Sequence, residues 1–359
     1  MKTLTVALPG RAYDIRIERG LLEKAGEAVR EACPKAKRLF VVTDSNVLPL
    51  YLGRVADSLK KAGFQVICHS FAAGEKAKCA ENLVALWEKM MAAGLTRTDG
   101  VVALGGGVVG DLAGFAAATI LRGVDYIQIP TTLLAQVDSS VGGKVAIDLQ
   151  AGKNLAGAFW QPKLVLMDPD TLDTLTDATF SGGMAEVIKY GCIWDKNFFD
   201  FLAARPSRAQ IMADIEHVLY TCCDVKRQVV EEDERDTGKR MLLNFGHTVG
   251  HAFELAGHYT EWSHGEAVAA GMCVAARLGV ALGVTDTAVP QDILNVAASL
   301  GLPTHIDCGW ETMVQAVGLD KKRTGDDITM ILLERIGKAK PVKMKKDVLL
   351  EHLNAIYGR

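Results

Sequence analysis

The sequence predicts an α/β protein in which a domain with a mainly parallel sheet is followed by a mostly α-helical domain. Short apolar runs alternate with amphipathic runs up to about residue 170, as in a parallel sheet covered by helices on both faces. Strand patterns nearly vanish after that point, and a length of 359 residues suggests two domains. We therefore expect a Rossmann-like α/β domain at residues 1–170 and an α-helical domain at 171–359.

The elements of the first domain follow from its periodicity. Two alternating runs, at 3–8 and 13–18, predict a hairpin. The later strands are short apolar runs, and the helices between them are amphipathic. Further strands are expected at 38–43, 64–70, 100–104, 126–129 and 164–167, and helices at 21–32, 47–62, 80–93 and 112–121. Short strands are also expected in the glycine-rich stretch after Pro130.

Helical periodicity dominates the second half of the chain. One strand-like segment, at 329–333, interrupts it. Helices are expected at 181–192, 208–231, 241–257, 264–282, 289–300 and 345–356.

The composition argues against several classes of protein. The formal net charge of −3 predicts no general attraction to nucleic acid or to an anionic membrane. The apolar runs end before membrane-spanning length, and the N-terminus lacks the apolar core of a signal peptide. None of the eight cysteines forms a C-x-x-C pair, which favours reduced thiols. We expect a soluble, cytoplasmic protein with no nucleic-acid or membrane partner.

A glycine-rich turn in the first half has the context of a dinucleotide site. Gly105, Gly107 and Gly110 follow a predicted strand and open a helix. Glycines let a backbone approach a pyrophosphate, and the amides of the helix N-terminus point at it. A plain glycine-rich turn explains the same letters equally well. Asp44, at the end of another strand, could bind ribose hydroxyls or cap a helix.

A histidine-rich stretch, 244–266, holds four of the eight histidines. His247 and His251 stand four apart and share one helical face with Glu254. Two glycines in the same run each cost a helix about 1 kcal/mol relative to alanine, which makes sense where something approaches the backbone closely. The ligand types favour a divalent metal site over a packed pair of polar helices.

Cationic side chains suggest an anionic substrate. Lys144, Lys189, Lys226 and Arg240 could together bind a molecule that carries phosphate and carboxylate. The alternative for the lysines near turns is an ordinary solvated surface. Lys189 stands three residues after Glu186, either as an exposed ion pair or, given its apolar surroundings, as a partly buried one.

Several long motifs identify a family. The chain contains, in this order, GGGVVGD, PTTLLAQVDSSVGGK, GKN, AEVIKYG, LLNFGHTVGH and HGEAVAAGM. In order and spacing they resemble the 3-dehydroquinate synthase family of sugar-phosphate cyclases, over residues 38–335. The resemblance implies a dehydroquinate synthase-like fold and a phosphate-eliminating carbon–oxygen lyase of the shikimate pathway, which leads to chorismate and the aromatic amino acids.

The implied reaction converts 3-deoxy-D-arabino-heptulosonate 7-phosphate to 3-dehydroquinate and phosphate. Its steps are transient oxidation by NAD, phosphate elimination, re-reduction, ring opening and intramolecular aldol closure. The implied cofactors are NAD and a divalent metal, zinc or cobalt. Family members are usually homodimers, and Arg122 is expected to reach the neighbouring subunit's site.

The resemblance also assigns residues. The implied metal ligands are Glu186, His247 and His264. The implied NAD contacts are Asp44, Asn46, Glu75, Lys78, Gly106, Gly107, Asp111, Thr131, Thr132, Lys153, Thr171, Leu172, Asp173 and Thr174. The implied catalytic and substrate residues are Arg122, Asp138, Lys144, Asn154, Lys189, Lys226, Arg240, Asn244, His251 and, from the Lys321–Lys322 pair, Lys322. We expect His251 to relay protons rather than bind metal.

Two positions depart from the family pattern, and two alternative functions stay open. Ala73 stands where an Asp is usual, and Asp236 stands where a Glu is usual. One alternative is a cyclase for another sugar phosphate, such as an inosose or valiolone synthase. The other is an NAD- and metal-dependent polyol or glycerol-phosphate dehydrogenase that releases NADH. The dehydroquinate pattern is matched by Lys144, Asn154, Arg240 and Asn244, and the set of cations is richer than a neutral polyol needs.

Overall fold

The computed structural model describes residues 1–236, 238–258, 260–318 and 327–357. The chain divides into two compact units: Met1–Leu175 with Leu219–Arg235, and Thr176–Val218 with Asp236–Arg359. The expected domains, 1–170 and 171–359, differ from these units mainly because Leu219–Arg235 belongs to the first unit.

The first unit is built on a seven-stranded sheet with the order β1-β2-β9-β6-β5-β3-β4. β1 pairs with β2 as an antiparallel hairpin, and every other neighbouring pair of this sheet is parallel. This confirms the predicted hairpin and the mainly parallel sheet. The strands are β1 (Lys2–Val6), β2 (Tyr13–Ile17), β3 (Arg38–Asp44), β4 (Gln65–Phe71), β5 (Gly100–Gly105), β6 (Asp125–Pro130) and β9 (Leu164–Met167).

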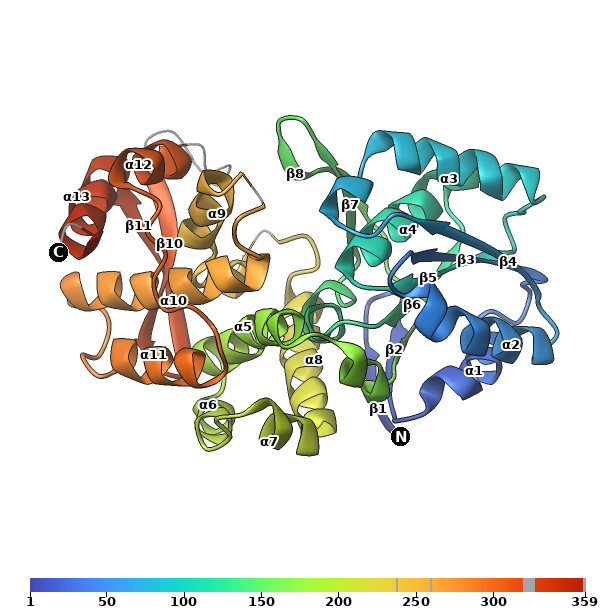
Figure 1. Cartoon of the computed structure of the whole chain (residues 1–359), viewed down its shortest axis with the longest axis horizontal. Helices are drawn as coiled ribbons and strands as arrows, with labels where there is room; N and C mark the ends of the chain where they lie inside the picture. The colour runs from blue at the N-terminus through green and yellow to red at the C-terminus, as the bar shows by residue number, and fades with distance from the viewer. Residues whose placement is uncertain (237, 259, 319–326, 358–359) are drawn as a thin grey trace. The chain divides into compact units, whose positions relative to one another are not determined.

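Helices cover both faces of this sheet (Figure 1). Along β3, Leu39 and Val41 pack into the core under α1 (Ala25–Ala32) and α2 (Gly53–Lys61). The alternate residues, Phe40 and Val42, pack into the core under α3 (Ala80–Ala92) and α4 (Gly107–Thr119). A strand that is apolar on both faces reads as a continuous hydrophobic run, which is why β3 was predictable. A small hairpin, β7 (Lys144–Leu149) with β8 (Gly152–Phe159), completes the unit.

The strand order reverses at one point of the sheet. The chain leaves β3 for β4 at the edge and returns to β5 on the other side of β3. In open α/β sheets, ligands bind at the carboxyl ends of the strands that flank such a reversal. Asp44 ends β3 and Gly105 ends β5, so both predicted cofactor segments lie at this position.

The second unit is mostly helical, as predicted. Its central helix is α10 (His264–Ala281), which is buried along most of its length (Figure 1). The other elements are α5 (Asp177–Ile193), α6 (Lys196–Ala203), α7 (Arg208–Ala213), α9 (His247–Ala256), α11 (Val289–Ser299), α12 (Trp310–Gly318), α13 (Lys346–Tyr357) and an antiparallel pair, β10 (Asp327–Arg335) with β11 (Lys338–Lys345).

Some predicted boundaries were wrong. The single helix expected at 208–231 is two helices, because α7 ends before Asp214 and α8 (Ile215–Glu232) begins after it. α8 starts in the second unit, and its residues from Leu219 onward belong to the first. The helix expected from residue 112 begins at Gly107, inside the glycine-rich turn.

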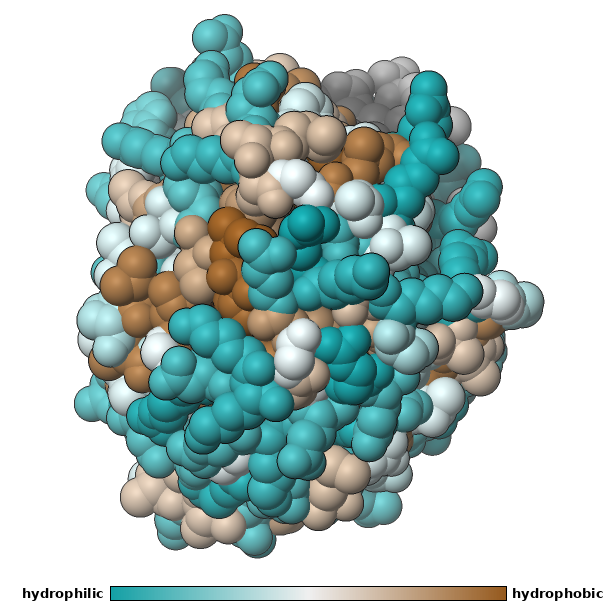
Figure 2. Space-filling model, turned by 90° about the vertical axis from the view of Figure 1, so that its right-hand side faces the viewer, coloured by the Kyte–Doolittle hydropathy of each residue, from teal (hydrophilic) through white to brown (hydrophobic). Residues whose placement is uncertain are grey.

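One side of the first unit is mainly hydrophilic (Figure 2). Figure 2 shows this side with its hydrophobic side chains in narrow patches between hydrophilic ones. Among the helices in the described ranges, none combines the length and hydropathy needed to cross a membrane. All eight cysteines are free thiols.

Candidate active site

Three predicted metal ligands come together in the second unit. Glu186 lies in α5, His247 is the first residue of α9, and His264 is the first residue of α10. Glu186 Oε1 lies 3.4 Å from Nε2 of each imidazole. This oxygen is buried and accepts no hydrogen bond within the described structure. A buried acceptor facing two imidazole nitrogens fits a bound cation, and one carboxylate with two histidines suits zinc.

The electrostatics keep two of the three ligands, Glu186 and His247, in their binding forms. Burial alone would raise the pKa of Glu186, but Lys189 and His247 lower that pKa well below its usual value. Burial lowers the pKa of His247, against the opposing pull of Glu186. Burial would lower the pKa of His264, but its contacts with Glu186 and Glu254 outweigh burial and raise that pKa to about 10. Lys189 also pairs with the second oxygen of Glu186, Oε2. The centre therefore presents an ionised carboxylate and a neutral imidazole, the forms that coordinate metal.

Close backbone contacts between helices set this geometry. A Cβ atom on Gly265 would lie 2.0 Å from the carbonyl oxygen of Gly182, one turn before Glu186 in α5. A Cβ atom on Gly271 would lie 2.2 Å from the carbonyl oxygen of Gly246, beside His247. The close approach predicted in the histidine-rich stretch is thus made by α10 itself. Helix packing at glycines lets side chains of three helices converge.

The start of α10 is fixed by a capping box. Ser263 accepts from the amide of Glu266, and the Glu266 carboxylate accepts from the amide of Ser263 at 2.8 Å. Such a pair satisfies two amides that a helix N-terminus leaves without partners. Glu266 therefore has a structural role, and His264 is held in the first turn.

His251 and Glu254 lie beside the same cluster. His251 is exposed, and its ring centroid lies 5.5 Å from that of His247. Glu254 Oε2 lies 3.5 Å from His264 Nδ1. His251, Glu254 and His264 thus form a second group whose ligand atoms all lie within 4.8 Å of one another. The two groups share only His264, so they are alternative arrangements at one place.

The glycine-rich turn forms the N-terminus of α4 in the first unit. Gly106 is the N-cap and Gly107 is the first helical residue. The amide of Thr131, after the neighbouring β6, donates to the carbonyl oxygen of Gly105 at 3.0 Å. Thr132 lies against Gly106. The turn therefore points helix amides past the carboxyl edge of the sheet, an arrangement suited to a pyrophosphate.

A buried lysine organises the acids nearby. Lys78 Nζ lies 2.8 Å from Glu75, 3.2 Å from Asp111 and 3.7 Å from Asp148. Burial raises the pKa of Asp111 to about 6, although Lys78 opposes that shift. Burial lowers the pKa of Lys78, but Asp111 and Glu75 outweigh it and raise that pKa. This cluster thus brings together three of the predicted cofactor residues, Glu75, Lys78 and Asp111.

Asp148 is a member of this group that sequence reasoning missed. Besides facing Lys78, it accepts from the amide of Asn154 at 2.8 Å. It therefore links the predicted cofactor residue Lys78 to a predicted substrate residue on β8. An isolated acid in an alternating strand carries no sequence signal for such a role.

Asp44 holds the turn that follows β3 in the structure. Its Oδ1 accepts from the amides of Asn46 at 2.8 Å and Val47 at 3.0 Å. The side chain of the adjacent Ser45 accepts a hydrogen bond from the amide of Ala73 at 3.0 Å. This bond holds the turn at Ala73, the position where the family usually has an Asp.

The predicted turn at 171–174 lies in a short helix, Pro169–Thr174. Tyr51 donates to the carbonyl oxygen of Thr171 at 3.1 Å. Thr171 and Leu172 are buried, whereas Asp173 and Thr174 are exposed. Lys153 lies in β8. Burial would raise the pKa of Glu75, but the charge of Lys78 and, to a smaller extent, that of Lys153 outweigh burial and lower this pKa.

The predicted substrate residues of the first unit include a buried pair and a strained arginine. Lys226 is buried, and its Nζ lies 2.8 Å from Asp138 Oδ1. Arg122 is exposed with a left-handed φ of 70°, directly after Leu121 at 53°. Non-glycine residues held in this region cost free energy and cluster at functional sites. Asn154, with a φ of 56°, and Lys144 are exposed on the β7–β8 hairpin.

The remaining predicted substrate residues belong to the second unit. Lys189 and Arg240 are buried. Asn244 donates its amide to the carbonyl oxygen of Met241 at 3.0 Å. Lys322 lies outside the described residues.

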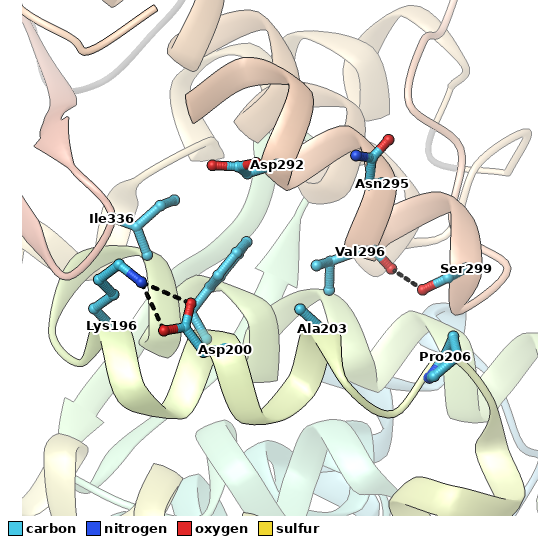
Figure 3. Close-up of a pocket in the computed structure, with 10 residues that line it drawn as sticks. Lys196, Asp200, Ala203, Pro206, Asp292, Asn295, Val296, Ser299 and Ile336 are labelled. Carbon is cyan, nitrogen blue, oxygen red and sulfur yellow. Dashed lines mark hydrogen bonds and ion pairs between the residues drawn. The ribbon is translucent and has the colours of Figure 1, made fainter. Parts of the chain in front are cut away.

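A separate pocket of about 370 Å³ lies in the second unit, beside α6 and α11 (Figure 3). Lys196 pairs with Asp200 at its rim, at 2.6 Å. None of the residues predicted for metal, cofactor or substrate lines it. The pocket is therefore not part of the candidate site.

Comparison with known proteins decides the family. Residues 68–182 match the 3-dehydroquinate synthase N-terminal family, and residues 183–323 match the 3-dehydroquinate synthase C-terminal family. The chain belongs to the 3-dehydroquinate synthase family. A relative named 3-dehydroquinate synthase, from Clostridium beijerinckii, is 45% identical over 340 residues, which cover 94% of this chain and 97% of that protein.

Solved structures of related cyclases share the fold. A 2-deoxy-scyllo-inosose synthase, crystallised with carbaglucose-6-phosphate, NAD+ and Co2+, has a TM-score of 0.89 and 26% identity, covering 99% of this chain and all of that one. A 2-epi-5-epi-valiolone synthase from Streptomyces hygroscopicus, with NAD+ and Zn2+ bound, has a TM-score of 0.88 and 28% identity, covering 98% of each chain. The predicted dehydroquinate synthase-like fold is confirmed.

Proposed function

We propose that this member of the 3-dehydroquinate synthase family converts 3-deoxy-D-arabino-heptulosonate 7-phosphate to 3-dehydroquinate and phosphate, as a carbon–oxygen lyase. The observation that carries the proposal is the Glu186–His247–His264 cluster, with a buried carboxylate oxygen facing two imidazole nitrogens. It stands in a chain that is 45% identical to a relative named for this activity.

The proposal includes two cofactors. Glu186, His247 and His264 would hold a divalent metal, zinc or cobalt. NAD would lie at the carboxyl ends of β3 and β5, against the N-terminus of α4 and the Lys78 group, so the first unit would be the NAD-binding one. When bound, NAD takes a hydride from the substrate and returns it, and the metal polarises substrate hydroxyls.

The charged residues of the chain would hold the substrate's two anionic ends. Guanidinium and ammonium groups bind phosphate and carboxylate through charge-assisted hydrogen bonds. A substrate fixed at both ends keeps its reacting atoms in register through successive steps. We assign this binding to the cations Arg122, Lys144, Lys189, Lys226, Arg240 and Lys322, and further substrate contacts to Asp138, Asn154 and Asn244.

His251 would relay protons in this scheme. Its side chain is exposed, and its ring stands next to that of His247. An imidazole with a usual pKa near 6.5 can accept and donate a proton near neutral pH. Its neighbours His247 and His264 would be occupied as ligands, which leaves His251 for this task.

We further propose a cytoplasmic homodimer in which Arg122 reaches the neighbouring subunit's site. Support comes from Arg122, whose side chain is exposed and which is the second of two consecutive left-handed residues. The free state of all eight cysteines suits a reducing compartment.

The experiment that tests the activity is an assay of phosphate release. Full-length protein with NAD and Zn2+ or Co2+ should release phosphate from the heptulosonate phosphate without accumulating NADH. A dehydrogenase would accumulate NADH and release no phosphate. A cyclase for another sugar phosphate would release phosphate only from that other substrate and none from the heptulosonate phosphate.

A further inference from the structure

We propose that Glu254 is a positioning residue of the metal centre: its buried carboxylate accepts a hydrogen bond from His264 Nδ1 and aims His264 Nε2 at the metal. The inference rests on the metal site proposed above. It adds a residue to that site that acts through a ligand rather than as one.

The geometry places His264 between two buried carboxylates. Glu254, in the second turn of α9, is 3% exposed. Its Oε2 lies 3.5 Å from His264 Nδ1, while Glu186 Oε1 lies 3.4 Å from His264 Nε2. A proton on Nδ1 that points to Glu254 leaves the lone pair of Nε2 on the side of Glu186 and His247. Carboxylates in this position fix the tautomer and raise the basicity of a metal-bound imidazole.

The two histidines differ in this outer partner. His247 Nδ1 lies 3.2 Å from the carbonyl oxygen of Phe245, a neutral acceptor on its own chain segment. His264 is the more exposed ligand, with 32% of its side chain accessible against 12% for His247. Like His247, it stands at the first residue of its helix. A ring in this place needs an external group to hold its plane, and Glu254 supplies one from a different helix.

A rival arrangement uses the same atoms. His251, Glu254 and His264 could ligate a metal themselves, with His264 turned to use Nδ1. The burial favours the first arrangement, because Glu186 Oε1 is a buried acceptor with no hydrogen-bond donor among the described residues, whereas His251 is exposed. A metal among His251, Glu254 and His264 would leave that buried oxygen unsatisfied, which destabilises the arrangement.

The test measures metal binding by the metal-free full-length protein. Zn2+ affinity is determined by competition with a chromogenic chelator, and the ligand field is read from the visible spectrum of the Co2+ form. The variants are Glu254→Ala, Glu254→Gln, His251→Ala and, as a control on the same unit, Glu311→Gln, an exposed acid in the first turn of α12. Melting temperatures of the metal-free proteins separate folding from binding.

We expect Glu254→Ala to weaken Zn2+ binding about 10- to 100-fold. Glu254→Gln should weaken it less, because the amide oxygen still accepts the hydrogen bond. The Co2+ spectrum of both should keep the band pattern of the unchanged ligand set, and Glu311→Gln should match wild type. If Glu254→Ala does not fold, the isosteric Glu254→Gln carries the test.

Two results overturn the proposal. Unchanged Zn2+ affinity in Glu254→Ala, or in Glu254→Gln when the alanine variant does not fold, means that Glu254 has no role in the centre. Equal loss of metal in Glu254→Ala and His251→Ala, with an altered Co2+ spectrum, makes Glu254 a ligand. A wild-type protein that binds no metal would instead contradict the proposed metal site itself.

Discussion

Gly265 packs so closely on Gly182 that a Cβ atom on Gly265 would lie 2.0 Å from the Gly182 carbonyl oxygen. The contact joins α10 to α5 directly beside His264 and one turn before Glu186. The spacing of two metal ligands therefore depends on the absence of a side chain at a residue that is not itself a ligand.

Gly265→Ala should push the start of α10 away from α5. We expect the free energy of unfolding to fall by about 1–3 kcal/mol, as for other overpacked sites, and metal affinity to fall with it because His264 moves away from Glu186. Chemical denaturation and chelator competition measure the two effects. The control is Gly53→Ala in α2, where a Cβ meets nothing within 4 Å, so this change should be neutral or stabilise by up to about 1 kcal/mol. Wild-type metal affinity in Gly265→Ala would contradict this account.

Alanine substitutions should distinguish the three metal ligands from the neighbouring His251. Alanine at Glu186, His247 or His264 should abolish stoichiometric metal, because each removes a primary ligand. His251→Ala should keep the metal and lose activity. Elemental analysis of the purified variants measures the metal. Should His251→Ala lose metal as completely as His247→Ala, the division of roles between these two histidines is wrong.

The stability should carry a pH signature of Asp111. Its pKa is raised from 3.8 to about 6, chiefly by burial, so the folded protein binds this proton more tightly than the unfolded chain. The contribution to stability is full below about pH 4 and is lost as the pH rises through 6. Asp111→Asn removes this dependence. The variant's unfolding free energy relative to wild type should thus increase between pH 4 and pH 7.5, by at most about 3 kcal/mol.

The matched comparison for Asp111 is Asp57→Asn, at an exposed position of α2. Denaturant unfolding of all three proteins at the two pH values measures the effect. The difference in unfolding free energy between Asp57→Asn and wild type should be the same at both pH values. A difference for Asp111→Asn that falls with rising pH would contradict the sign of the shift. We also expect Asp111→Asn to bind NAD more weakly, since the same acid is assigned to the cofactor.

Lys226→Met should weaken substrate binding while metal and NAD binding stay unchanged. Lys226 is a buried cation beside Asp138, and hydrogen bonds to charged groups are worth about 1.5–3 kcal/mol. We expect kcat/KM to fall about 10- to 100-fold. Steady-state kinetics measure this, with Lys196→Met, at the rim of the separate pocket, as the control. An equal fall in kcat/KM for Lys226→Met and Lys196→Met would show that Lys226 contributes only through the overall charge of the protein.

The α/β half was predictable because its signals are local. β3 and β5 are continuous apolar runs, and each strand is followed by a helix, so the periodicity alone indicates parallel layers. β11 was missed because its sequence, KAKPVKMK, alternates lysines with few apolar residues. Residues 219–235 were assigned to the wrong unit because helical periodicity does not reveal which core a helix packs against.

The metal centre shows a similar limit. Spacing along one helix suggests His247 and His251 as joint ligands. The second histidine of the proposed metal site is instead His264, which comes from another helix. Glu186 stands about sixty residues earlier, and no periodicity connects it to the histidines. Only the motifs of the family joined these residues before the structure placed them together. Asp148 had no such motif and was missed.

The ratio of phosphate released to NAD supplied shows whether the protein uses NAD catalytically or consumes it. Full-length protein, loaded with Zn2+ or Co2+, receives the heptulosonate phosphate in large excess over NAD. The account predicts many molecules of phosphate and of 3-dehydroquinate per molecule of NAD, with no lasting NADH absorbance, and no release by His264→Ala. Phosphate that never exceeds the NAD supplied, or NADH that accumulates in step with substrate consumed, would contradict it.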